Sequence, residues 1–159
     1  MIVLSDGMQV HNLAQIRLLD LPGQLGAAGA APILPEAVYG ELVAESSYAE
    51  NLQYTFDIGK PKDTAFVDSL LSQLDVGRAQ AIALARERGA ELLLMDHRKG
   101  RAVAASFGIP HVGLMAFLVE GKFRGRIKAL KPLLDELIPR PKHATGDDLY
   151  SRVLREVGE

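Results

Sequence analysis

The sequence predicts an α/β fold built on a central, mostly parallel sheet that helices cover on both faces. Short apolar segments alternate with helical patterns along the chain, and this alternation favours crossover connections between parallel strands. The first apolar segment, residues 2–5, is uninterrupted, as expected for a strand that is buried on both faces. The chain has 159 residues, 48% of them hydrophobic, so we expect one domain over residues 1–159 with a sizeable core.

The elements of the first half of the chain are predicted from local patterns. Pro22-Gly23 should end the first helix, and residues 24–31, which are rich in Ala and Gly, suit either a short helix or a loop. Pro35 fits the first turn of a helix, because the N–H that proline lacks has no partner there. The predicted elements are a strand at 2–5, a helix at about 10–18, a strand at 32–35, a helix at 36–45, irregular chain at 46–61 with an edge strand within 53–58, and a helix at 63–74.

The second half of the chain continues the alternation. Asp75 can cap the next helix and Gly89 can end it, while the alanines of that helix permit close approach to the sheet. The remaining predicted elements are a helix at 77–88, a strand at 92–95, a helix at 98–107, a strand at 110–112, and helices at 114–123, 127–138 and about 147–157, the last of which packs on the others.

Two aspartates directly follow predicted strands. Asp6 ends the first apolar run, and Asp96 ends the run that begins at residue 91. Ligands of an open parallel sheet gather outside the carboxyl ends of its strands, so two carboxylates on neighbouring strands would suit a hard cation. A third acid, Glu41, lies in the helix after the strand at 32–35. The pattern predicts metal-assisted phosphoryl chemistry on nucleic acid, although each aspartate also suits the N-cap of a helix.

The net charge of −2 conceals an uneven distribution of charge. Residues 18–59 contain six acids and no Lys or Arg, whereas residues 97–143 contain ten Lys or Arg and three acids. An acidic region beside a basic one suits a cation site flanked by a phosphate-binding surface, although chance clustering of surface charge gives the same counts. The predicted nucleic-acid contacts are Arg78, Arg98, Lys99, Arg101, Lys122 and Arg124.

Composition excludes several classes of site. The chain has no cysteine, hence no disulfide, no thiolate metal site and no Cys nucleophile, which fits a reducing, cytoplasmic location. No apolar run approaches the roughly 18 residues of a membrane span, and no basic region of a signal peptide precedes the first apolar segment. A flavodoxin-like or other nucleotide-binding α/β protein would share the strand ends, but the chain lacks a glycine-rich phosphate loop.

Several short motifs occur in a recognisable order along the chain. They are the strand ending in Asp6, then Ile33-Leu34-Pro35-Glu36-Ala37-Val38-Tyr39-Gly40-Glu41-Leu42, Leu74-Asp75-Val76-Gly77, Ala81-Ile82-Ala83-Leu84-Ala85, Leu93-Leu94-Met95-Asp96 and Ile109-Pro110-His111-Val112-Gly113. Over nearly its whole length the chain resembles PIN domains, in particular PIN-like proteins close to toxin–antitoxin nucleases.

The resemblance implies a three-layer α/β/α fold and a Mg²⁺- or Mn²⁺-dependent endoribonuclease. In such a protein Asp6, Glu41 and Asp96 would hold one or two ions, and Lys and Arg side chains would hold the RNA backbone. The resemblance is also compatible with the toxin of an antitoxin pair and with a homodimer. Hard cations prefer carboxylate oxygens, so the acids suit the chemistry that the resemblance implies.

Four positions depart from the pattern of that family. Gly7 stands where Thr or Ser is usual, Arg78 and Gln80 stand where acids are common, and Leu114 stands where Thr is frequent. A guanidinium in place of a carboxylate changes the local charge by two units and should weaken cation binding. Two hypotheses follow: an active ribonuclease that uses three acids, and a PIN domain that has lost cleavage and binds RNA or a protein.

Overall fold

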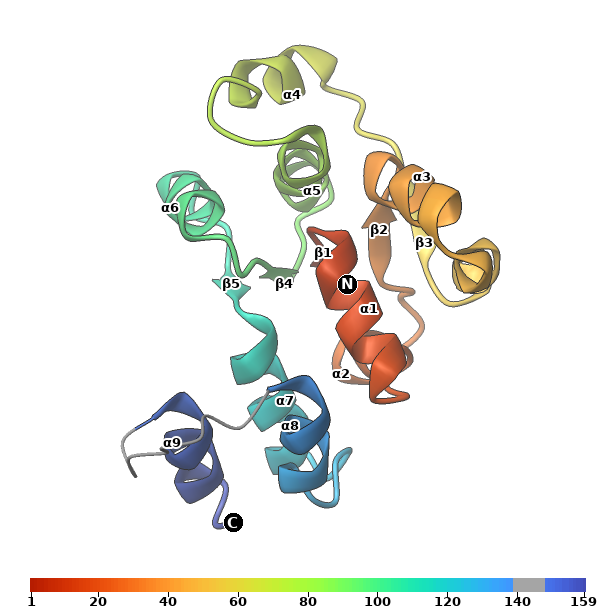
Figure 1. Ribbon diagram of the computed structural model, residues 1–159. Coiled ribbons are helices and arrows are strands. Elements are labelled where there is room, and N and C mark those ends of the chain that lie inside the picture. The colour runs from red at the N-terminus through yellow and green to blue at the C-terminus, as the bar shows by residue number, and fades with distance from the viewer. Residues whose placement is uncertain (139–147) are drawn as a thin grey trace.

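The computed structural model describes residues 1–138 and 148–159, and its centre is a parallel sheet of five strands (Figure 1). The strands lie in the order β3-β2-β1-β4-β5, and every pair of neighbours is parallel. This arrangement confirms the α/β fold predicted from the sequence. The strands are β1 (Ile2–Leu4), β2 (Ile33–Pro35), β3 (Asp57–Gly59), β4 (Leu92–Leu94) and β5 (His111–Val112).

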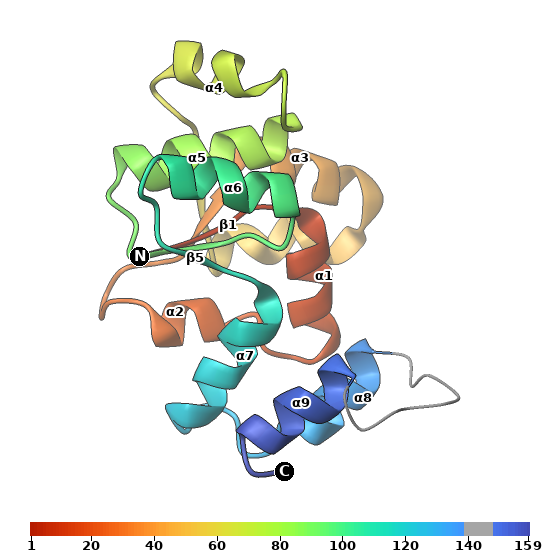
Figure 2. The same cartoon turned by 90° about the vertical axis from the view of Figure 1, so that its left-hand side faces the viewer.

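Helices cover both faces of the sheet, as the alternating sequence pattern requires (Figure 2). In Figure 2, α5 and α6 lie above the sheet with α4 outside them, and α1, α2 and α7 lie below it. The helices are α1 (Gly7–Gln15), α2 (Leu21–Leu25), α3 (Glu36–Glu45), the 3-10 helix η1 (Ser47–Tyr54), α4 (Thr64–Leu70), α5 (Val76–Glu87), α6 (Arg98–Ser106), α7 (Leu114–Phe123), α8 (Lys131–Leu137) and α9 (Leu149–Glu156).

Alternate residues of the strands divide the core between the two faces. Val3 pairs with both Ile33 and Leu93, and all three side chains belong to the apolar cluster beneath α4, α5 and α6. Ile2 and Leu4 point to the other face and join the cluster formed with α1, α2, α3, α7, α8 and α9. Because a strand residue and its successor face opposite ways, a strand buried on both faces must be apolar throughout.

The alanine-rich helix α5 packs closely across the middle of the sheet, as predicted. Ala79, Ala81 and Ala83 are fully buried. Close packing continues at the start of the helix, where a Cβ on Gly77 would lie only 2.9 Å from Cγ2 of Val38 in α3. Small side chains therefore bring the first turn of α5 against the sheet edge where Asp6 lies.

The chain between the first two strands differs from the prediction. Helix α1 begins at Gly7 and ends at Gln15, because Arg17 turns the backbone with a φ of 60°. Pro22-Gly23 does not break a helix but lies in the first turns of α2, where proline costs no hydrogen bond. The segment expected to be irregular also contains regular structure, since η1 occupies residues 47–54 and the edge strand begins at Asp57.

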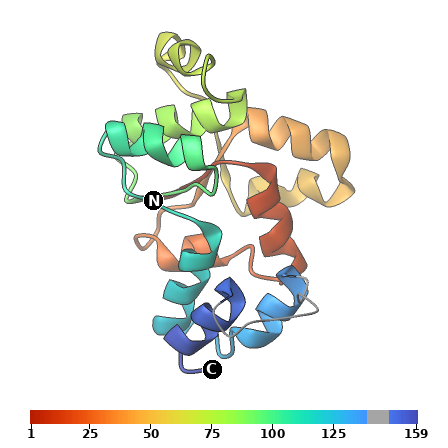
Figure 3. The ribbon, with the colours of Figure 1, turned by 60° about the vertical axis from the view of Figure 1, so that its left-hand side comes forward.

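The C-terminal helices pack against α1 on the lower face (Figure 3). Gln15 Nε2 of α1 donates to the Glu136 carbonyl of α8 at 3.0 Å, and Val153 and Leu154 of α9 enter the shared apolar cluster. Helix α8 begins at Lys131 rather than at the predicted residue 127. The predicted start of the last helix at residue 147 lies outside the described residues. None of the helices in the described ranges is long and apolar enough to cross a membrane.

Glu159 joins the C-terminus to the start of α8 through hydrogen bonds. Its carboxylate accepts the N–H of Leu130 at 2.7 Å and that of Lys131 at 3.1 Å, and Lys122 Nζ lies 3.3 Å away. The bond from Leu130 is the main reason that the pKa of Glu159 lies below its ordinary value of 4.5, and it outweighs the opposing effect of burial. Glu159 thus supplies hydrogen-bond acceptors for the N–H groups at the start of α8.

Candidate active site

Asp6 and Asp96 meet at the carboxyl edge of the sheet, as the sequence predicted. Leu4 pairs with Leu94 in the two adjacent central strands, and each aspartate follows two residues later. Both side chains line a pocket of about 590 Å³ whose other wall is apolar, formed by side chains of α1, α7, α8 and α9. The two acids therefore share one opening, in the place where open parallel sheets bind ligands.

Gln9 connects the two aspartates. Its backbone N–H donates to Asp6 Oδ1 at 3.0 Å, and its side-chain amide donates to Asp96 Oδ2 at 2.9 Å. Its amide oxygen accepts the N–H of Ser5 at 2.9 Å, so both polar groups of the side chain are engaged with the strand ends, and the residue is only 1% exposed. A buried amide with these partners fixes the orientation of Asp96.

Sequence reasoning assigned no role to Gln9, although a signal was present. Asp6-Gly7-Met8-Gln9 has the spacing of a capping box, in which the residue three positions after the N-cap returns to the start of the helix. Asp6 does cap α1. The side chain of Gln9, however, reaches Ser5 and Asp96 instead of the N–H of the cap residue. The bond to Asp96 could not be read from the local sequence, because Asp96 follows a different strand, β4.

Asp96 does not cap the helix that follows it, contrary to the alternative reading of the sequence. His97 is the N-cap of α6, and its Nδ1 accepts the N–H of Gly100 at 3.1 Å. Asp96 Oδ1 instead accepts the N–H of Leu114, the first residue of α7, at 2.9 Å. The backbone passes so close that a Cβ on Gly113 would lie 2.9 Å from Asp96 Oδ1.

Arg78 reaches the aspartates from the first turn of α5. Its NH1 contacts Asp75 Oδ2 at 2.6 Å, and its NH2 lies 3.5 Å from Asp6 Oδ2. The side chain is 24% exposed, and its Nε atom is buried without a hydrogen-bond partner among the described residues. A fixed positive charge therefore stands beside Asp6.

Glu41 and Asp96 line different hollows. Glu41 is an exposed residue of α3 and lines a smaller hollow of about 270 Å³ with Asp6, Asp75 and Arg78. Asp96 does not line that hollow, and Glu41 does not line the larger pocket. Within residues 1–138 and 148–159, no three His, Cys, Asp or Glu side chains are gathered closely enough to hold a metal ion. The predicted group of three acids is thus not assembled.

The predicted basic contacts on α6 lie at different distances from the acids. Arg101 is near, because the Cβ position of Gly113 is 3.7 Å from Arg101 NH1 and 3.9 Å from the carboxyl carbon of Asp96. Arg98 is exposed in the first turn of the same helix. Lys99 lines a separate groove between α4 and α6. The start of α6 therefore places at least Arg101 where a phosphate beside Asp96 could be contacted.

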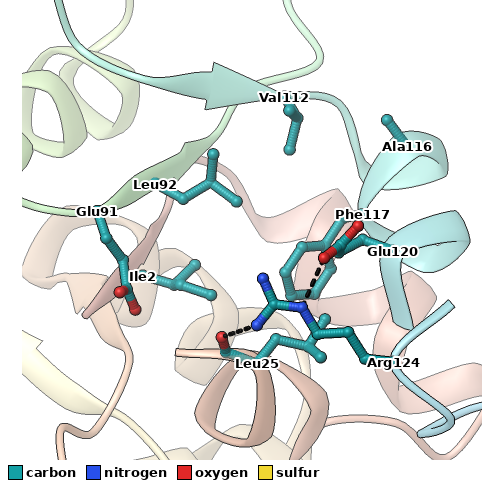
Figure 4. A pocket seen from close by; sticks show the side chains of 9 residues that line it. All are labelled: Ile2, Leu25, Glu91, Leu92, Val112, Ala116, Phe117, Glu120 and Arg124. Atoms are coloured by element: carbon teal, nitrogen blue, oxygen red, sulfur yellow. Dashed lines mark hydrogen bonds and ion pairs between the residues drawn. The ribbon is translucent and has the colours of Figure 1, made fainter. Parts of the chain in front are cut away.

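Lys122 and Arg124 lie at the opposite edge of the sheet. Arg124 points into a pocket that it lines with Ile2 and Leu92, the first residues of β1 and β4 (Figure 4). The volume of this pocket is about 400 Å³. The Arg124 guanidinium contacts Glu120 and the Leu25 carbonyl, while Lys122 is paired with Glu159. The structure does not bring these two cations together with the aspartates.

Comparison with known families agrees with this geometry. A family profile described as a PIN domain matches residues 2–159. The chain is a PIN domain. No curated protein matches it. The match covers every strand of the sheet, in agreement with a nuclease type of fold.

The positions at which this PIN domain departs from the usual pattern have local structural reasons. A Cβ on Gly7 would lie 3.2 Å from Cδ2 of Leu42, which limits the side chain that fits between α1 and α3. Gln80 accepts the N–H of Ala37 at 3.0 Å and so serves the start of α3. Leu114 is buried, and its backbone N–H donates to Asp96. Of these departures, Arg78 alone changes the charge next to the aspartates.

PIN domains generally bind divalent metals, and the donors of this chain fit Mg²⁺ or Mn²⁺ in a restricted sense. Mg²⁺ is commonly held by one or two carboxylates together with substrate phosphates. Asp6 and Asp96 supply two carboxylates whose orientations are fixed by hydrogen bonds. Each carboxylate oxygen in these bonds retains a second lone pair. The pair suits an ion completed by substrate, while the contact between Arg78 and Asp6 opposes it.

Proposed function

We propose that this PIN domain is a Mg²⁺- or Mn²⁺-dependent endoribonuclease whose ion is held by Asp6 and Asp96. The observation that carries the proposal is the Gln9 bridge, which orients both carboxylates at the mouth of one pocket. Hard cations prefer carboxylate oxygens. The oriented carboxylates of Asp6 and Asp96 lie at the carboxyl edge of the sheet, where open parallel sheets bind ligands. Glu41 lines the neighbouring hollow and is not part of this pair.

The bound ion would supply a water of lowered pKa and would stabilise charge on the phosphate in the transition state. The residues of the chain perform the remaining tasks. Gln9 keeps Asp96 oriented, and the N–H of Leu114 holds its second oxygen. Arg101 and Arg78 contact the RNA backbone, and Arg98 adds charge at the start of α6.

The test is a calorimetric titration of Mn²⁺ together with an RNA cleavage assay. Asp6→Asn and Asp96→Asn should each abolish cleavage and weaken Mn²⁺ binding while the far-ultraviolet circular dichroism stays unchanged. Asp68→Asn, at an exposed acid of α4 far from the pocket, makes the same charge change and should alter neither. Cleavage that survives in both site variants would overturn the proposal.

The contact between Arg78 and Asp6 favours a second candidate function, a PIN domain that binds RNA without cleaving it. In such a protein the Arg78 guanidinium neutralises Asp6 in place of a metal ion. The phosphate backbone of the RNA then binds Arg78 and Arg101. This candidate predicts RNA binding of equal strength with Mn²⁺ and with a chelator, and no cleavage at any Mn²⁺ concentration.

We also propose that the protein is the toxin of a toxin–antitoxin pair. The apolar wall of the pocket includes the exposed side chains of Met8 and Leu149, which a partner protein could cover. Expression of the chain alone should arrest growth, and Asp96→Asn should relieve the arrest. Unimpaired growth with the wild-type chain at a verified protein level would contradict this part of the proposal.

A further inference from the structure

We propose that Arg78 is an internal competitor of the metal ion, and that an RNA phosphate relieves the competition by drawing its guanidinium away from Asp6. This inference rests on the proposed function and adds a regulation to the same site. It states that metal and phosphodiester bind cooperatively, and that Arg78 carries the coupling.

The position of Arg78 between the two hollows is the first observation. Arg78 and Asp6 line both the larger pocket, which holds Asp96, and the smaller one, which holds Glu41. The guanidinium therefore stands where the two hollows adjoin. Its withdrawal from Asp6 would leave Oδ2 of Asp6 open to an ion that Asp96 also contacts in the larger pocket.

The hydrogen bonding of Arg78 is the second observation. NH1 makes a short contact with Asp75, but NH2 is 3.5 Å from Asp6 and the buried Nε has no partner in the described part of the chain. A guanidinium offers five N–H donors and pairs best with planar, bidentate acceptors. A phosphate at the pocket mouth would satisfy donors that the present contacts leave unused, so the contact with Asp6 is the one surrendered.

The consequence is a linkage between two ligands. If phosphate withdraws the guanidinium from Asp6, phosphate raises the affinity for metal, and metal raises the affinity for phosphate by the same factor. Couplings of this kind typically amount to about 5- to 150-fold. The free protein would then hold its ion weakly and would complete its metal site on RNA.

The experiment measures the Mn²⁺ affinity of the whole chain by calorimetry, with and without a short oligodeoxynucleotide, after subtraction of a protein-free blank. A methylphosphonate oligonucleotide of the same sequence is the uncharged control. Arg78→Gln should bind Mn²⁺ roughly tenfold more tightly than wild type without oligonucleotide, and the charged oligonucleotide should then add little. Arg88→Gln, at the other end of α5, removes the same charge and should behave as wild type.

The outcomes separate this inference from the proposed function. If wild type and Arg78→Gln bind Mn²⁺ equally and the oligonucleotide strengthens binding equally in both, the metal site stands and the competition is overturned. If Arg88→Gln raises Mn²⁺ affinity as much as Arg78→Gln, the effect is one of net charge and the inference is again overturned. If no variant binds Mn²⁺ under any condition, the metal-dependent function fails, and the inference fails with it.

Discussion

The side-chain amide of Gln9 donates to Asp96, a residue 87 positions away in the sequence. The backbone N–H of Gln9 donates to Asp6. One buried residue of α1 thereby sets the relative orientation of the two carboxylates that follow β1 and β4. Asp6, Asp96 and Gln9 therefore form one hydrogen-bonded unit at the ends of two adjacent strands.

Gln9→Ala should disable the site and lower stability. The change leaves the N–H of Ser5 without its acceptor in a buried position, which costs about 1–3 kcal/mol. Chemical denaturation would measure this loss, and Mn²⁺ titration would show weaker binding. Gln9→Glu keeps an acceptor for Ser5 but places a third carboxylate beside the pair, so its melting temperature should rise with Mn²⁺ more than that of wild type. Mn²⁺ binding by Gln9→Ala as tight as that of wild type would contradict the bridging role.

Gly113→Ala should displace Asp96. The φ of Gly113 is −78°, which alanine adopts freely, so the effect comes only from the new Cβ at 2.9 Å from Asp96 Oδ1. Loss of the bond from Leu114 to a charged acceptor should cost roughly 1.5–3 kcal/mol and reduce Mn²⁺ affinity. Gly40→Ala is the matched control, because its Cβ meets open space inside α3 and should stabilise the fold by about 0.5–1 kcal/mol. Normal Mn²⁺ binding by Gly113→Ala would refute the close approach.

Glu159→Ala should destabilise the protein in a pH-dependent way. The pKa of Glu159 is lowered in the folded state, chiefly by the bond from Leu130, so its contribution is complete above the unfolded value of 4.5 and disappears as pH falls through the lower folded value. At neutral pH the variant should lose about 1 kcal/mol, typical of a lost helix cap. Paired urea titrations across the acid range should show wild type and variant converging. A constant difference would disprove the assignment.

Arg101→Gln should weaken RNA binding without sequence preference. Arg101 lies beside Asp96, and a lost phosphate contact should reduce the salt dependence of binding by about one unit of slope. Fluorescence anisotropy at several salt concentrations measures the slope. Arg124→Gln should leave it unchanged, since Arg124 lies at the opposite edge of the sheet. Equal losses in both variants would indicate diffuse charge attraction.

The fold could be predicted because its signals are local. An uninterrupted apolar strand such as Ile2–Leu4 predicts burial on both faces of the sheet. The small residues of α5 predict that this helix packs closely on the sheet. Boundaries were less predictable where one backbone angle decides them. The positive φ of Arg17 ends α1 early, and Pro22 lies in the first turn of α2 rather than ending α1.

The sequence by itself determined the parallel α/β fold and the position of Asp6 and Asp96 at one edge of the sheet. Both could be recognised from neighbouring residues, because a buried strand is a short apolar run and each aspartate directly follows one. Only the tertiary structure decided what surrounds them. The packing of helices far apart in the chain decides the partners of Gln9 and the turn of Gly113 against Asp96. It also decides that Glu41 and Asp96 line different hollows and that Arg124 lies at the opposite edge of the sheet. Such contacts are set by packing in three dimensions, which no local pattern records.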